Sequence, residues 1–245
     1  MYIFVRPLNQ PLEHIRQILH LLLLAAVLHG CGEDAAFEKH VTEGIIEYDV
    51  TYPELDEDNL MLEMLPDEMI MTFKEDKFKS ELKTGAGIVE MSLIADGEKR
   101  ELNNMVKLFS DRYVLKLNES ETHDFVDVLP PFQMEFLDGT DTIADALCKR
   151  ILIDFGQAKT ESYIFAFTDV IALKSPNWCT PYRDIEGVLL DYRIDNYDMV
   201  MRLKARKIIP KDIPDEAFIV DDRYEQLTRE EFAELVVENM KIFME

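Results

Sequence analysis

The stretch GIIEYDVTY, residues 44–52, decides the fold class of this chain. Large apolar side chains alternate in it with polar ones, and the alternating residues are Ile46, Glu47, Tyr48, Asp49, Val50, Thr51 and Tyr52. A period of two residues is typical of a β-strand that buries one face and exposes the other. The stretch therefore predicts a half-buried strand at the start of a sheet.

The same alternation recurs along most of the chain. The further runs are EMIMTFK (68–74), KFKSELK (77–83), GIVEMSLIAD (87–96), MVKLF (105–109), RYVLKL (112–117), CKRILIDF (148–155), ESYIFAFTDVIAL (161–173), GVLLDYRI (187–194) and YDMVMRLKARKII (197–209). Turn signals such as Asp96-Gly97 separate several of them, and no connection is long enough for the helix that parallel neighbours require. We therefore predict a mainly β fold, an antiparallel meander of about ten strands, with its longest interruption at residues 138–145.

Residues 228–243 follow a different period. Thr228 and Glu231 have the spacing of a capping box, in which each residue satisfies a free main-chain N–H of the other. The apolar residues behind them recur at helical spacing, and they are Phe232, Leu235, Val236, Met240 and Phe243. We expect one amphipathic helix over residues 228–243 that packs on the sheet.

The N-terminal stretch LLLLAAVLHGC, residues 21–31, predicts export. Its uninterrupted apolar run covers the eight residues from Leu21 to Leu28, whereas a helix that crosses a bilayer needs roughly 20. Arg6 and Arg16 precede the run, so residues 1–30 have the basic and apolar regions of a secretory signal peptide. The alternative is a short buried or interfacial helix.

The segment Leu28-His29-Gly30-Cys31 resembles the lipobox of bacterial lipoproteins, with His29 in place of the small residue usual at that position. The resemblance implies that cleavage leaves Cys31 as the acylated first residue of the mature chain. Residues 31–42 would then form a lipidated tether, and residues 43–245 a single β-rich domain. We expect a protein of the bacterial cell envelope, anchored by lipid to the outer membrane on its periplasmic or surface side.

The composition argues against several classes of partner and activity. The chain has 26 Lys and Arg against 49 Asp and Glu, a formal net charge of −23. Because nucleic acid is bound through cations that neutralise phosphates, we expect no nucleic-acid partner. There is no CxxC pair, and His123 falls in a predicted polar loop, so we expect neither a metal site nor a cofactor. The GxSxG, HExxH and glycine-rich phosphate motifs are missing as well, and we expect no enzyme.

Cys148 and Cys179 are the cysteines that remain after Cys31. An even number of cysteines in an oxidising compartment favours a disulfide. Such a bond would close a loop of about 30 residues and stabilise the fold by roughly 3–4 kcal/mol. Two separate buried thiols are the alternative.

Several segments together resemble predicted lipoproteins of Bacteroidetes, of the DUF4412 or GLPGLI-like type. The matching stretches are EGIIEYDVTYP, LPDEMIMTFKEDKFKSEL, VKLFSDRYVLKL, TIADALCKRILI and SPNWCTPYRDIEGVLLDY. The resemblance implies a curved antiparallel sheet or incomplete barrel wrapped around a helix or cavity, similar to the fold of the periplasmic lipoprotein carrier and receptor. Carriers of that fold hold acyl chains against the concave face of the sheet.

Methionine usage indicates where a hydrophobic ligand would bind. Alternation puts apolar residues of three strands on shared faces, and these candidate ligand-binding residues are Met69, Met71, Phe73, Met91, Leu93, Met199 and Met201. Flexible thioether side chains adapt to ligands of irregular shape, although methionine also fills ordinary cores. Two functions follow as hypotheses: binding of a lipid, another hydrophobic ligand or a lipoprotein on the concave face, or an accessory role in an outer-membrane assembly with a protein partner and no small ligand.

Overall fold

The computed structural model describes residues 40–56, 65–83, 89–158, 161–196 and 199–241. The described residues belong to one compact unit, His40–Glu245. The predicted signal peptide, Cys31 and most of the predicted tether therefore lie outside the described residues. No helix in the described part of the chain is long and apolar enough to cross a membrane.

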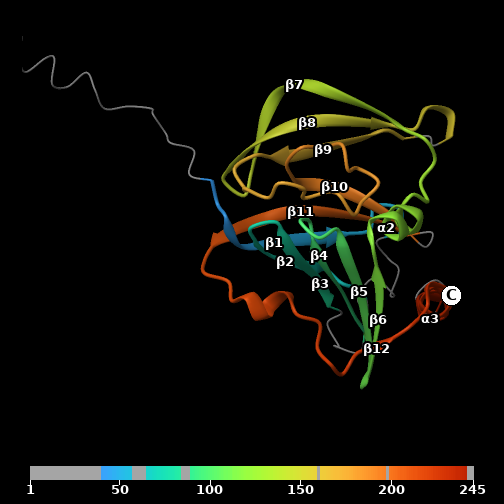
Figure 1. The fold of residues 1–245 in the computed structure, drawn as a ribbon. Coiled ribbons are helices and arrows are strands. Elements are labelled where there is room, and N and C mark those ends of the chain that lie inside the picture. Colours follow the sequence, from blue (N-terminus) through green and yellow to red (C-terminus); the bar gives the residue numbers. More distant parts are fainter. Residues whose placement is uncertain (1–39, 57–64, 84–88, 159–160, 197–198, 242–245) are drawn as a thin grey trace, which may run out of the picture. The chain divides into compact units, whose positions relative to one another are not determined.

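Twelve strands among the described residues form one sheet (Figure 1). Their bounds are β1 (Glu43–Thr51), β2 (Glu68–Lys74), β3 (Lys77–Lys83), β4 (Val89–Asp96), β5 (Glu101–Leu108), β6 (Asp111–Leu117), β7 (Gln133–Ile143), β8 (Ala146–Asp154), β9 (Tyr163–Thr168), β10 (Val188–Asn196), β11 (Met199–Pro210) and β12 (Glu225–Gln226). Two helices accompany the sheet, α2 (Glu119–Val126) and α3 (Arg229–Lys241), together with the 3-10 turns η2 (Gly156–Ala158) and η3 (Asp215–Phe218). The predicted mainly β fold class is confirmed, and the sheet has twelve strands where we expected about ten.

The strand order is β12-β6-β5-β4-β3-β2-β1-β11-β10-β9-β8-β7. β1 to β6 follow one another as a meander, the chain then crosses to the far edge, and β7 to β11 return until β11 pairs with β1. Neighbours are antiparallel, except that the two-residue β12 pairs in parallel with β6. The order ends at β7 and β12, the top and bottom strands of the curved sheet in Figure 1, so the sheet is open.

Tight turns hold the first meander in register. Glu75 closes the β2–β3 turn in the left-handed region, at φ 54°. The neighbouring turn after β4 packs against it, since the Gly97 N–H donates to the main-chain carbonyl of Asp76 over 2.8 Å. A Cβ at Gly97 would lie 2.6 Å from a carboxylate oxygen of Asp76, so only glycine allows this approach.

Two predictions between β6 and β8 are wrong. Residues 138–145 do not interrupt the sheet, because β7 runs from Gln133 to Ile143 and absorbs the polar stretch in a bulge between Leu137 and Thr140. The stretch around His123 is the helix α2, which Asn118 and Glu121 cap reciprocally over 3.1 and 2.9 Å. This pattern of an N-cap asparagine followed three residues later by glutamate was readable in the sequence.

The chain after β11 wraps around the edge of the sheet. Residues 211–224 cross one face of β3 to β6, where Phe218, Val220 and Tyr224 pack on a small cluster of buried residues. β12 then pairs with the edge strand β6, and α3 follows on the other face. The predicted capping box is confirmed, since the N–H and hydroxyl of Thr228 donate to the Glu231 carboxylate over 2.9 and 2.8 Å.

Candidate functional site

We define the inner face of the sheet as the face that carries Tyr48, and the outer face as the opposite one. Two rows of directly paired residues cross the inner face. One row runs through Tyr48, Met69, Leu82, Met91 and Val106, and the next through Ile46, Met71, Ser80, Leu93 and Asn104. Directly paired residues on neighbouring strands point to the same face. The rows therefore bring methionines from β2 and β4 together with apolar residues of β1, β3 and β5.

A cavity of about 260 Å³ lies on this part of the inner face. The sheet forms one wall, and the other walls come from Phe125 of α2, from Phe232 and Val236 of α3, and from the loop before β10. The full set of lining residues is Tyr48, Met69, Met71, Phe78, Ser80, Leu82, Met91, Ser92, Leu93, Asn104, Met105, Val106, Phe125, Pro176, Asn177, Cys179, Thr180, Val188, Leu189, Tyr192, Ile194, Met201, Phe232 and Val236. None of these side chains is charged, so the site offers an apolar surface with a few neutral polar groups.

The structure brings five of the seven predicted ligand-binding residues together in this cavity. The residues that line it are Met69, Met71, Met91, Leu93 and Met201. Phe73 and Met199 do not line it, and both are buried in the main core cluster. Phe73 and Met199 are therefore ordinary core residues, which was the alternative to a role in ligand binding.

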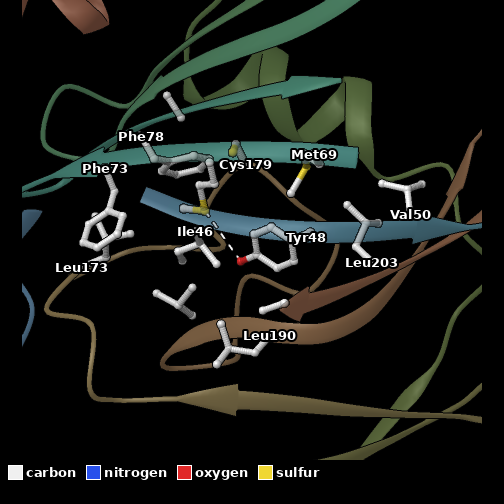
Figure 2. Packing of buried hydrophobic residues seen from close by; sticks show 14 of the residues in the cluster. Ile46, Tyr48, Val50, Met69, Phe73, Phe78, Leu173, Cys179, Leu190 and Leu203 are labelled. Atoms are coloured by element: carbon white, nitrogen blue, oxygen red, sulfur yellow. Dashed lines mark hydrogen bonds between the residues drawn. The ribbon is translucent and has the colours of Figure 1, made fainter. Parts of the chain in front are cut away.

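Tyr48 is the centre of the wall that β1 contributes. Its hydroxyl donates a hydrogen bond to the main-chain carbonyl of Leu189 over 2.9 Å and lies 3.9 Å from the Met71 sulfur, the contact dashed in Figure 2. The Tyr192 ring meets the Tyr48 ring edge to face at 6.0 Å between centroids. Burial raises the pKa of Tyr48 well above its ordinary value, and the nearby Tyr192 adds to the rise. Tyr48 is therefore a neutral structural link between β1 and β10.

The loop that closes one side of the cavity is fixed by its own hydrogen bonds. The Asn177 amide donates to the carbonyls of Ile185 and Gly187 over 2.7 and 2.9 Å. Trp178 packs inward at 3% exposure, with the Arg100 guanidinium 5.5 Å from the centre of its ring. Trp178 is therefore part of the core and does not form an exposed edge. The neighbouring Cys179 is thereby held at the cavity wall.

The predicted disulfide is not formed, because Cys148 and Cys179 are both free and buried. β8 is regular between Lys149 and Ile153, and its Ile151 packs with Tyr182 and Ile185 of the segment that follows Cys179. Alternation therefore turns Cys148 to the opposite face of the strand. Burial raises the pKa of Cys148 to about 11 and that of Cys179 to about 12. The alternative of two separate buried thiols describes the structure.

The outer face carries a pocket of different chemistry. It measures about 360 Å³ and lies between β3 to β6 and the crossing segment before β12. Four cationic and four acidic side chains line it, and pairs among them include Lys79 with Glu81 at 3.0 Å and Lys107 with Glu90 at 2.7 Å. Its positive and negative side chains are equal in number, whereas none of the described residues that line the inner cavity is charged.

Sequence reasoning missed much of the cavity wall. Phe125 was missed because the capping pattern of α2 was overlooked, and Asn104 because the β5 run was taken to begin at Met105. Tyr192 alternates with Ile194 in β10 and could have been assigned to the same face as the methionines. The loop residues Pro176 to Thr180 follow no periodic pattern, so only the folded chain places them.

No arrangement for metal binding or acid–base chemistry accompanies the cavity. In the described part of the chain, no group of three or more His, Cys, Asp or Glu side chains is placed to hold a metal ion. The described residues of the wall are neutral, and among them the Cys179 thiol and the tyrosines have pKa values raised by burial. The arrangement therefore suits binding of an apolar molecule.

Comparisons with known proteins assign no family. No protein-family model matches the chain, and no curated protein matches it either. Among solved structures, the chain matches MucB, from the crystal structure of MucB in complex with MucA(peri), at 7% sequence identity and a TM-score of 0.29. The match covers 79% of this chain and 59% of the MucB chain. A likeness this distant assigns neither a fold family nor a function.

Proposed function

We propose that this protein is a cell-envelope lipoprotein that binds a lipid, or another hydrophobic molecule, in the cavity of the inner face. The observation that carries the proposal is the cavity wall, in which flexible methionines and aliphatic residues surround about 260 Å³ without a charged side chain. Ligand pockets measure roughly 300–1,000 Å³ and are mostly apolar with a few polar groups. The cavity is slightly smaller than that range and suits one short chain or the end of a longer one.

The role proposed is binding and not catalysis. General acid–base chemistry needs a titratable group whose pKa lies near the working pH. The groups that line the cavity are neutral, and burial moves the pKa of its thiol and tyrosine hydroxyls further from neutrality. Uncharged walls favour retention of an apolar molecule.

The anchor belongs to the same proposal. The Leu28-His29-Gly30-Cys31 segment supports acylation at Cys31 and attachment to the outer membrane. With Cys31→Ser in the full chain, we expect the protein to lose labelling by a radioactive fatty acid and to leave the membrane fraction. Labelling that persists in this variant would contradict the anchor and leave the cavity proposal untouched.

Native mass spectrometry tests the cavity directly. Residues 31–245 contain the whole compact unit and are exported behind a cleavable leader, with Cys31→Ser to prevent acylation. We expect an apolar adduct at a one-to-one ratio, or uptake of the neutral probe N-phenyl-1-naphthylamine with enhanced fluorescence. Leu93→Trp fills the cavity and should abolish both, whereas Lys116→Trp on the exposed outer face of β6 should leave them unchanged. A wild-type protein with neither adduct nor probe uptake would overturn the proposal.

The second candidate is an accessory lipoprotein with a protein partner and no small ligand. It is favoured by the burial of Phe73 and Met199 in the core and by the seating of Phe232 and Val236 of α3 over the inner face. In that case α3 is a permanent cover. The protein would then take up no probe, and crosslinking in intact cells would identify its partner.

A further inference from the structure

One side chain in the cavity wall differs from its surroundings. Asn104 lies in the middle of β5 and faces the cavity, directly paired with Leu93 of β4 and Leu115 of β6. Along its own strand, the neighbours on the same face are Leu102 and Val106. An amide is therefore embedded in an apolar row. The side chain is half-buried, and no hydrogen bond joins it to another residue in the part of the chain that the structure describes.

The unused amide favours one class of ligand over another. An asparagine side chain can donate two hydrogen bonds and accept two. A pure hydrocarbon that filled the cavity would strip water from this amide without replacing its hydrogen bonds. A ligand with an ester, amide or hydroxyl group beside its chain would replace them. Ser80, two strands away in the same row, also faces the cavity and provides a second neutral polar group.

The charge of the ligand is limited by the same wall. Among the described residues, no lysine, arginine or histidine lines the cavity, and the chain as a whole has a formal net charge of −23. A carboxylate or phosphate drawn into the cavity would lose its hydration and meet no cation. An anionic lipid is therefore disfavoured both by the apolar wall and by the field of the surrounding protein.

We infer that the cavity selects an uncharged amphiphile, a single acyl chain joined to an ester, amide or hydroxyl group that hydrogen-bonds to Asn104. This inference rests on the proposed function and specifies its ligand class. It assigns to Asn104 the discrimination between neutral amphiphiles and hydrocarbons, and to the uncharged wall the discrimination against fatty acids. The methionines supply the adaptable apolar surface for the chain.

Displacement of N-phenyl-1-naphthylamine from residues 31–245 with Cys31→Ser tests the inference, with monolaurin and lauric acid as competitors of equal chain length. At about pH 8, where the fatty acid is ionised, monolaurin should bind at least about tenfold more tightly. Asn104→Leu keeps the volume of the side chain and removes its hydrogen bonds. It should weaken monolaurin roughly 3- to 10-fold, the effect of one neutral hydrogen bond, while probe affinity stays the same.

The matched control is Asn103→Leu, the same substitution one residue away on the outer face of β5, which should change neither competitor. Equal affinities for monolaurin and lauric acid would overturn the inference, and so would an unchanged monolaurin affinity in Asn104→Leu. Both results leave the proposed function standing as long as the probe binds. Failure of the probe to bind the wild-type protein would instead overturn the proposed function itself.

Discussion

The inner face of the sheet is packed in two different ways. Over β8 to β10, aromatic side chains cover it. We call this part the aromatic half, and its residues are Phe132, Phe155, Tyr163, Phe165 and Tyr182. Over β2 to β5 it is lined by Met69, Met71 and Met91 together with aliphatic residues, and this methionine half contains the cavity. The two halves belong to one sheet and meet at Tyr48 and Tyr192, whose rings touch edge to face.

The difference between the halves is one of stiffness and filling. The rings contact one another at fixed edge-to-face or tilted angles, with centroids 4.9 Å apart for Phe165 and Tyr182 and 5.5 Å apart for Phe132 and Phe155. Such rings have few rotatable bonds and prefer these packing angles. Methionine side chains have three rotatable bonds and fit irregular gaps. The aromatic half therefore fixes the sheet, and the methionine half is free to adapt to a ligand.

Two alanine substitutions, one in each half, test this difference with the largest expected effect. Phe165 is fully buried, so Phe165→Ala should lower the free energy of unfolding by about 3–5 kcal/mol. Met91 is half-buried and lines a cavity that already exists, so Met91→Ala should cost only about 1 kcal/mol. Urea denaturation monitored by circular dichroism measures both. Equal losses would show that the methionine half is packed as tightly as the aromatic one.

Much of this architecture could be predicted from the sequence. The strands from β2 to β6 form hairpins between neighbours in sequence, and their alternation and turn residues specify register locally. The face shared by Met69 and Met71 followed from the period of two, and the capping box of α3 followed from Thr228 and Glu231. These features depend on neighbours within a few residues along the chain.

What could not be predicted depends on contacts between distant segments. The pairing of β1 with β11 joins residues such as Val50 and Leu203, and no local signal indicates it. The cavity exists because the side chains of α3 and of the loop at Asn177 do not fill the space over the inner face. The size of that space depends on the volumes of side chains from distant segments. Whether Cys148 and Cys179 meet depends on which face of β8 the first one occupies, and the number of cysteines says nothing about that.

The two thiols provide a second test, because Cys179 faces the methionine half and Cys148 does not. Burial raises the pKa of each thiol by two units or more, so at about pH 8 both should react with Ellman's reagent at least about a hundredfold more slowly than an exposed thiol. With Cys31→Ser, two thiols should titrate in urea without reductant. Saturating N-phenyl-1-naphthylamine should slow Cys179 further and leave Cys148 unchanged. No titratable thiol in urea would mean that a disulfide forms after all.

The helix α3, which lies over the methionine half, can be destabilised at its first turn. The Thr228 hydroxyl shares two hydrogen bonds with Glu231, as donor to its carboxylate over 2.8 Å and acceptor from its N–H over 3.3 Å. Thr228→Ala should therefore destabilise the protein by about 1 kcal/mol. Thr228→Ser retains the hydroxyl and should restore most of the loss in urea denaturation. A serine variant as unstable as the alanine variant would mean that the methyl group, and not the cap, matters.

The smallest expected effect is the pH dependence of the same cap. Hydrogen bonds from the N–H and hydroxyl of Thr228 lower the pKa of the Glu231 carboxyl in the folded protein. Because the folded state then binds fewer protons than the unfolded chain, this stabilisation is complete above the ordinary glutamate pKa and is lost as the pH falls through the folded value. Glu231→Gln has a neutral amide at the same place. The difference in unfolding free energy between the wild type and Glu231→Gln should therefore be largest near about pH 7 and should shrink below about pH 4. A difference that stays constant over this range would show that the charge of Glu231 contributes nothing to seating α3 over the cavity.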